Sequence, residues 1–227
     1  MRCTCKDLTY TLAQSDRKTM SIYVEPDGNV VVRAPKNIDK ERIKAIVDLK
    51  RFWIHKSIAE FRELNRTKVE RQIASGEGFL FMGKSHRLKL DGNADVPLAL
   101  RNGFFLLREK DARRAKNLFI GFYREQGKEH LPQRVEYFRK KMGIGKVNVR
   151  VLELKKRWAS WGKKNLNFHW KIMLAPISVI DYVIVHELAH TVKKDHSPAF
   201  WEIVESVMPN YREKKEWLRV NGANLDI

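Results

Sequence analysis

Cysteines and long apolar stretches are what this sequence most clearly lacks. Only two of its 227 residues are cysteines, Cys3 and Cys5, and they stand too close together for an ordinary disulfide. No segment approaches the roughly 20 apolar residues that cross a membrane. The basic N-terminus also has no apolar core like that of a signal peptide. We therefore expect a soluble protein of the reducing cytoplasm, with no membrane partner.

Acidic residues are also scarce relative to basic ones. The chain has 45 lysines and arginines against 27 aspartates and glutamates, which gives a formal net charge of +18. Such a charge favours anionic partners, namely nucleic acid, nucleotides or acidic protein surfaces, without choosing among them. A charged surface that only contacts water is the alternative. The length is enough to bury a core, so no metal is needed merely for folding.

Three of the seven histidines fall within residues 186–196. His186, Glu187 and His190 form an H-E-x-x-H motif, and two histidines four residues apart lie on the same face of a helix, where both can reach one cation. Glu187 is turned about 100° from His186, so it is aimed at a water on the metal rather than at the metal itself. This predicts a general base. Two histidines hydrogen-bonded inside a core are the alternative.

His196 is the candidate third ligand. Polar residues after His190 end the apolar run, and Ser197-Pro198 is typical of an N-cap followed by the first residue of a new helix. His196 thus lies in a turn, at the offset of the third histidine in H-E-x-x-H-x-x-G-x-x-H, although Lys193 replaces the glycine. The sequence predicts a zinc site made of His186, His190 and His196.

The N-terminal region reads as mainly β. Residues 20–24 and 30–34 alternate around a turn at 26–29, which predicts a hairpin. Apolar residues after Asp39 recur at helical spacing as far as Leu64, which predicts one long amphipathic helix. Four short strands then resemble a meander, the last two joined by Asn102-Gly103. These strands are expected at 79–82, 86–90, 96–100 and 104–107.

The C-terminal region reads as mixed. Residues 111–142 are helical in pattern, with Gly127 and Pro132 able to split the helix and Gly143 as its stop. Strands are predicted at 147–151 and 166–173, with a turn at 162–164 between them. An apolar helix follows, opened by a Ser178-x-x-Asp181 capping box, and carries the metal motif. We expect an α+β protein with two domains. Residues 1–110 would form a mainly β region with an inserted helix, and residues 111–227 a helix, a small sheet, the metal helix and C-terminal helices.

Several motifs carry a resemblance that spans nearly the whole chain. They are Val-Arg-Ala-Pro at 32–35, Phe-Trp-Ile at 52–54, Arg-Trp-Ala-Ser at 157–160, Asn-Leu-Asn at 165–167, Met-Leu-Ala-Pro at 173–176, Asp-Tyr-Val at 181–183, the H-E-x-x-H motif and His-Ser-Pro-Ala-Phe-Trp at 196–201. The chain resembles the YgjP-like metallopeptidases, relatives of SprT-like and other zincin proteins. The resemblance implies a zincin-like C-terminal domain, zinc held by His186, His190 and His196, and a catalytic Glu187.

Two departures from the family pattern stand near the predicted site. Trp161 replaces the usual cysteine of Arg-Trp-Gly-Ser-Cys, so any role of that cysteine is absent. His169 stands where an asparagine is common. It is either a fourth ligand or proton donor, or, by default, a structural or surface histidine. Both changes are expected to alter specificity rather than chemistry.

The main functional hypothesis is zinc-dependent hydrolysis of a peptide bond. Tyr211, Arg157 and Arg212 are candidates for substrate or transition-state contacts, although each can equally be packed or solvated. One alternative is a metal-dependent hydrolase of nucleotide phosphoanhydrides, although no glycine-rich phosphate loop supports it. Another is a protease recruited to protein on nucleic acid, as SprT-like relatives imply. Both rest on basic residues near the motif, namely Lys155, Lys156, Arg157, Lys163, Lys164, Lys171, Lys193 and Lys194.

Overall fold

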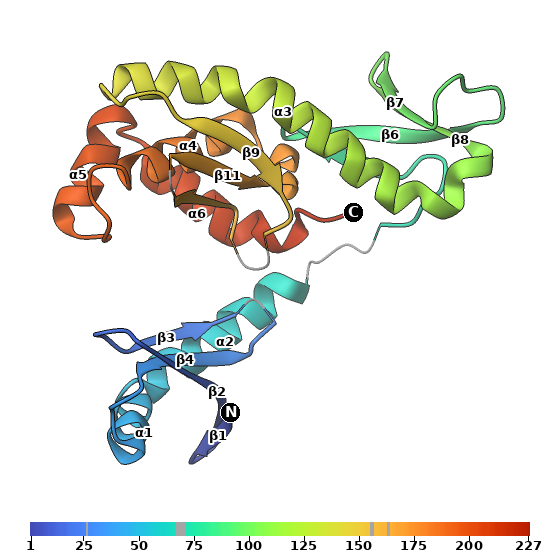
Figure 1. Ribbon diagram of the computed structural model, residues 1–227. Helices are drawn as coiled ribbons and strands as arrows, with labels where there is room; N and C mark the ends of the chain where they lie inside the picture. The colour runs from blue at the N-terminus through green and yellow to red at the C-terminus, as the bar shows by residue number, and fades with distance from the viewer. Residues whose placement is uncertain (26, 67–70, 155–156, 163) are drawn as a thin grey trace. The chain divides into compact units, whose positions relative to one another are not determined.

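The computed structural model describes residues 1–227 except 26, 67–70, 155–156 and 163 (Figure 1). The chain forms two compact units, Met1–Val69 and Glu70–Ile227. The boundary expected at residue 110 instead falls inside the second unit. The reason is aromatic packing, because Phe79 stacks on Phe119 with ring centroids 4.3 Å apart and so joins the strands before residue 110 to the helix after it.

The first unit holds a four-stranded sheet in the order β1-β2-β4-β3. The strands are β1 (Arg2–Cys5), β2 (Leu8–Ser15), β3 (Ser21–Val24) and β4 (Val30–Pro35). The predicted hairpin is confirmed, since β3 and β4 pair antiparallel. Gly28, at φ +83°, gives their turn a conformation that other residues rarely adopt.

Two helices, α1 (Lys40–Leu49) and α2 (Arg51–Arg66), replace the single helix expected in this region. Both helices contribute to the core of the sheet, through Ile43 and Val47 from α1 and Ile54 from α2. The break lies at Lys50, which is neither glycine nor proline. The apolar spacing therefore could not reveal it.

The second unit begins with a sheet in the order β5-β6-β8-β7. Its strands are β5 (Gly78–Phe81), β6 (Lys84–Asp91), β7 (Leu98–Arg101) and β8 (Phe104–Arg108). The Asn102-Gly103 hairpin is confirmed, with both residues at positive φ as this turn requires. The predicted meander is wrong, because β8 pairs parallel with β6 and so separates β6 from β7.

Helix α3 (Ala115–Lys141) runs unbroken through Gly127 and Pro132, after a short 3₁₀ helix at Glu109–Arg114. Gly127 is needed for packing, since a Cβ there would lie 3.0 Å from a methyl of Val151. Gly143, at φ +66°, ends the helix as predicted.

A third sheet, in the order β10-β11-β9, lies beside the metal motif. Its strands are β9 (Asn148–Leu152), β10 (Ala159–Gly162) and β11 (Asn165–His169). Strand β10 is an edge strand that pairs antiparallel with β11. Strand β11 ends at His169, earlier than expected, because a buried 3₁₀ helix at Trp170–Leu174 takes up the rest of the apolar run.

Helices α4 (Ile177–Ala189), α5 (Pro198–Val207) and α6 (Tyr211–Asn221) complete the second unit, with a 3₁₀ turn at Gly222–Asn224. The predicted capping box is wrong, because Asp181 pairs with Arg134 of α3 instead of capping α4. Ser197-Pro198 does start α5 as predicted. The described residues thus form a mixed fold of six α-helices and three small sheets. None of these helices is both long and apolar enough to traverse a membrane.

Candidate active site

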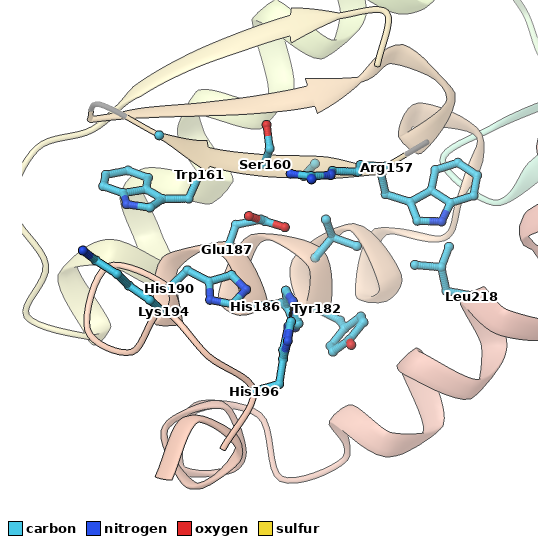
Figure 2. A pocket seen from close by; sticks show the side chains of 14 residues that line it. Arg157, Ser160, Trp161, Tyr182, His186, Glu187, His190, Lys194, His196 and Leu218 are labelled. Carbon is cyan, nitrogen blue, oxygen red and sulfur yellow. Dashed lines mark hydrogen bonds between the residues drawn. The ribbon is translucent and has the colours of Figure 1, made fainter. Parts of the chain in front are cut away.

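Helix α4 positions the first two histidines of the motif. Ten of its thirteen residues are buried, so the core holds the helix on most of its surface. His186 lies in the last turn and His190 is the C-cap. The chain then returns in a loop that brings His196 back to them just before α5, as Figure 2 shows. One ligand nitrogen from each ring lies within 4.8 Å of the other two.

The three rings fit a zinc ion in geometry and in protonation. Tetrahedral zinc with Zn–N bonds of about 2.0–2.1 Å separates its ligand nitrogens by about 3.3–3.4 Å, and His186 Nε2 lies 3.1 Å from His196 Nε2. His190 Nδ1 lies 3.0 Å from the carbonyl oxygen of Lys193 and must donate to it, which leaves Nε2 available to a metal ion. Burial, with help from His190 and His196, lowers the pKa of His186 to about 3, so its lone pair is available.

Glu187 lies beside the three histidines. It is buried, and the backbone N–H of Trp161 in β10 donates to its carboxylate. Burial raises the pKa of Glu187, while His190, the Trp161 amide and Arg157 lower it in part. A carboxylate whose pKa is raised takes up a proton more readily, which suits it to proton transfer.

A cleft of about 850 Å³ opens between the edge strand β10 and helix α4. The histidine triad and Glu187 all line it, together with residues 157–162 around β10 and Tyr182 and Val183 of α4. Lys194 and Leu218 complete its walls (Figure 2). The volume is in the range of sites that enclose a small ligand or a few residues of a peptide.

The three residues predicted to contact the substrate or transition state lie in different parts of the second unit. Arg157 lines the cleft, whereas Tyr211 and Arg212 are not among the described residues that do. Tyr211 is buried and stacks on Trp201, with ring centroids 5.1 Å apart. Arg212 pairs with Glu205 at 3.4 Å.

His169 is also absent from the described lining of the cleft. Its Nδ1 accepts from the backbone N–H of Lys171 at 3.0 Å, so the ring caps the 3₁₀ helix that follows β11. This geometry matches the structural reading of His169 rather than that of a fourth ligand.

Tyr182 is a cleft residue that the sequence reasoning missed. Burial raises its pKa to about 12, with smaller contributions from Tyr211 and Glu187, so its hydroxyl keeps its proton. The signal was present, because Tyr182, His186 and His190 follow one another at intervals of four residues and therefore share one helical face.

Few of the described basic residues near the motif reach the cleft. Lys155, Lys156 and Lys163 lie outside the described residues, and of the other five only Arg157 and Lys194 line it. Lys171 pairs with Asp226 at 2.8 Å. Of the described basic residues near the motif, two therefore line the cleft.

Comparison with known proteins decides the family. The sequence model described as "YgjP-like, metallopeptidase domain" matches residues 18–221. This chain belongs to the YgjP-like family. The resemblance inferred from the motifs is thereby confirmed, and a YgjP-like metallopeptidase domain makes the protein a metallohydrolase that requires a metal ion. The histidine triad is the group that could hold that ion.

Two further comparisons complete the picture of this YgjP-like chain. The search of curated proteins returned no match. Among solved structures, the chain is similar to the metallopeptidase zymogen of Pyrococcus abyssi abylysin, with 24% identity and a TM-score of 0.37. That likeness covers 40% of this chain and 91% of the other.

Proposed function

We propose that the protein hydrolyses peptide bonds with zinc held by His186, His190 and His196 and with Glu187 as the general base. The observation that carries the proposal is the convergence of three imidazole nitrogens within 4.8 Å, beside a buried carboxylate, in a metallopeptidase-family chain. Neutral imidazoles are preferred ligands of zinc, and three of them leave one coordination position open.

Bound zinc would act as a Lewis acid that polarises the scissile carbonyl and lowers the pKa of a water molecule to near 7. Glu187 accepts a proton from the attacking water and later delivers it to the leaving amine. The Trp161 amide holds the carboxylate in place during both transfers. Between the two proton transfers Glu187 is protonated, and its burial favours this uncharged state.

Strand β10 offers a place for an extended polypeptide. It lies at the edge of its sheet, and its residues line the cleft above the triad. An extended segment can add to such an edge through main-chain hydrogen bonds, which place its carbonyls in regular positions. An unfolded or loosely folded protein chain is therefore the substrate class that the cleft favours.

Arg157 and Tyr182 are the residues placed to contact the substrate carbonyl. Arg157 lines the cleft and interacts electrostatically with Glu187, so its positive charge is near the reacting position. Tyr182 stays protonated at neutral pH and can donate a hydrogen bond. Groups of this kind stabilise the negative charge that develops on the carbonyl oxygen.

Nucleotide hydrolysis has weaker support than peptide hydrolysis. Holding a triphosphate requires several cations around the phosphates, and the described part of the cleft offers Arg157 and Lys194. The comparisons likewise lend no support to a nucleic-acid partner. A polypeptide is therefore the proposed substrate.

The test compares Glu187→Gln with the wild type on an unfolded protein substrate and measures bound zinc in both. We expect the variant to keep about one zinc per chain and to lose activity by about 10²–10⁴-fold, the usual contribution of a general base. Glu205→Gln is the matched control, because Glu205 lies on α5 and pairs with Arg212 away from the cleft. Wild-type turnover by Glu187→Gln would remove the assigned role.

A further inference from the structure

The two ends of the cleft differ in chemistry. Figure 2 shows Leu218 at one end and Trp161 and Lys194 at the other. Trp158, which precedes β10, and Val183 of α4 are further apolar residues that line the cleft. Val183 stands one helical turn before Glu187 and therefore lies on the same face of α4. An apolar lining residue is thus adjacent to the carboxylate of Glu187.

Gly222 leaves room for the indole of Trp158 beside α6. It follows Leu218 by four residues, so the two lie on one face at the end of α6. A Cβ at residue 222 would lie 3.0 Å from Cζ2 of Trp158, closer than ordinary van der Waals contact. The absence of a side chain therefore lets the indole pack against α6 next to Leu218. Trp158 and Leu218 also contact the buried core, which fixes both walls before any substrate binds.

We propose that Trp158, Val183 and Leu218 form an apolar subsite that receives a large hydrophobic side chain from one of the two residues flanking the cleaved bond. This inference rests on the proposed function and specifies its substrate class. A leucine, methionine or phenylalanine side chain fills the subsite, so that its own apolar surface and that of the subsite are both removed from water. Alanine is too small and leaves part of the subsite in contact with water. Lysine would place an unpaired cation among apolar walls and beside Arg157.

The first experiment profiles cleavage of a randomised peptide library by the zinc-loaded wild type. Matched peptides that differ only at the selected position then give kcat/KM for leucine, alanine and lysine. We expect leucine to exceed alanine by about 10- to 100-fold, as pockets that sense a few methylene groups do, and lysine to be the poorest. The ratio between peptides does not depend on how much of the enzyme is active.

Variants of the subsite residues then test whether the preference for leucine over alanine comes from the subsite. Leu218→Ala should lower the leucine-to-alanine ratio at least threefold, and Leu218→Glu should reverse the preference so that lysine exceeds leucine. Gly222→Ala should also lower the ratio, because the added methyl displaces Trp158. Val220→Ala is the control, since Val220 lies exposed on the same helix and is not among the residues lining the cleft. Its ratio should match the wild type.

Outcomes for the subsite and for the proposed function are distinguishable. Metal-dependent cleavage with no hydrophobic preference, or a ratio unchanged in both Leu218 variants, would overturn the subsite and leave the proposed function standing. If the wild type cleaves neither the library peptides nor the unfolded protein substrate, the proposed function fails, and calorimetry with zinc-loaded Glu187→Gln decides the subsite. At least tenfold tighter binding of the leucine peptide than of the alanine peptide supports it; equal or undetectable binding overturns it.

Discussion

His186 Nε2 and His196 Nε2 lie 3.1 Å apart, although the two residues are ten positions apart in the sequence. A buried phenylalanine, Phe200, holds the turn that joins them. Its ring centroid lies 4.6–5.0 Å from those of all three site histidines. The loop after His190 therefore needs no glycine at Lys193 to return, because α5 anchors it from the far side.

His196 is predicted to be a ligand as necessary as the two helical histidines. His196→Ala should weaken zinc binding by more than about 100-fold, since removing a ligand costs more than disturbing its hydrogen-bonding partner. Competition with a chromophoric chelator measures the change. His55→Ala is the control, because His55 pairs with Asp7 in the first unit. Undiminished affinity in His196→Ala would show that the loop histidine is not a ligand.

Arg157 is predicted to tune the general base. Its positive charge lowers the pKa of Glu187, so Arg157→Met should raise that pKa. Because the base must be ionised to act, the acidic limb of the pH profile of kcat/KM should move to higher pH. Arg150→Met, on an exposed position of β9, should leave the limb in place. If the acidic limb of Arg157→Met is unchanged or moves to lower pH, Arg157 does not lower the pKa of the general base.

The ion pair between Arg134 of α3 and Asp181 of α4 is predicted to stabilise the metal helix. Asp181 is only 8% exposed and accepts from Arg134 Nε at 2.8 Å. Arg134→Met should cost about 2–3 kcal/mol in urea unfolding, because a buried carboxylate loses its partner. Lys128→Met, which breaks an exposed pair with Glu125, should cost less than about 0.5 kcal/mol.

A double variant shows how much of the lost stability comes from leaving the Asp181 charge buried without a partner. Arg134→Met with Asp181→Leu should recover part of the stability lost in the single variant, since the unpaired charge is gone. Equal losses in Arg134→Met and Lys128→Met would show that the α3–α4 pair contributes no more than a surface pair.

His169 is predicted to make folding sensitive to acid. Burial, then Lys171, lowers its pKa below the usual 6.5, and its Nδ1 must be unprotonated to accept from the Lys171 amide. The unfolded state therefore binds the extra proton first. Stability from this residue is complete above pH 6.5 and is lost as pH falls below it, by at most about 1.4 kcal/mol per pH unit.

The corresponding measurement compares His169→Asn with the wild type by urea unfolding at several pH values in a chelator. Asparagine keeps an acceptor for the Lys171 amide but does not titrate. The free energy of unfolding of the wild type should fall more steeply below pH 6.5 than that of the variant. The site histidines contribute equally to both proteins, so parallel curves would refute this role of His169.

The convergence of the three histidines was predictable because it depends on local spacing. His186 and His190 share a helical face by the period of the helix alone, and Ser197-Pro198 marks the start of α5 that turns the chain back to His196. Tyr182 follows the same period and could have been found with it. The hairpins at Gly28 and Gly103 were likewise predicted from residues that adopt positive φ.

What failed depends on contacts distant in sequence. Asp181 reads as part of a capping box until Arg134 is known to lie beside it. The apolar segment after β11, Trp170–Leu174, is a 3₁₀ helix, but its sequence also fits a strand because buried residues of both structures are equally apolar. Residue 110 lies inside the second compact unit, and the contact of Phe79 with Phe119 that spans it cannot be read from either segment alone.

Anomalous diffraction at the zinc absorption edge, from crystals of the zinc-loaded protein, shows where the ion binds. We expect one strong peak about 2.0–2.1 Å from a nitrogen of each of His186, His190 and His196, with the Glu187 carboxylate outside that distance. A peak bound elsewhere, or none at the three histidines, would contradict the proposed zinc site.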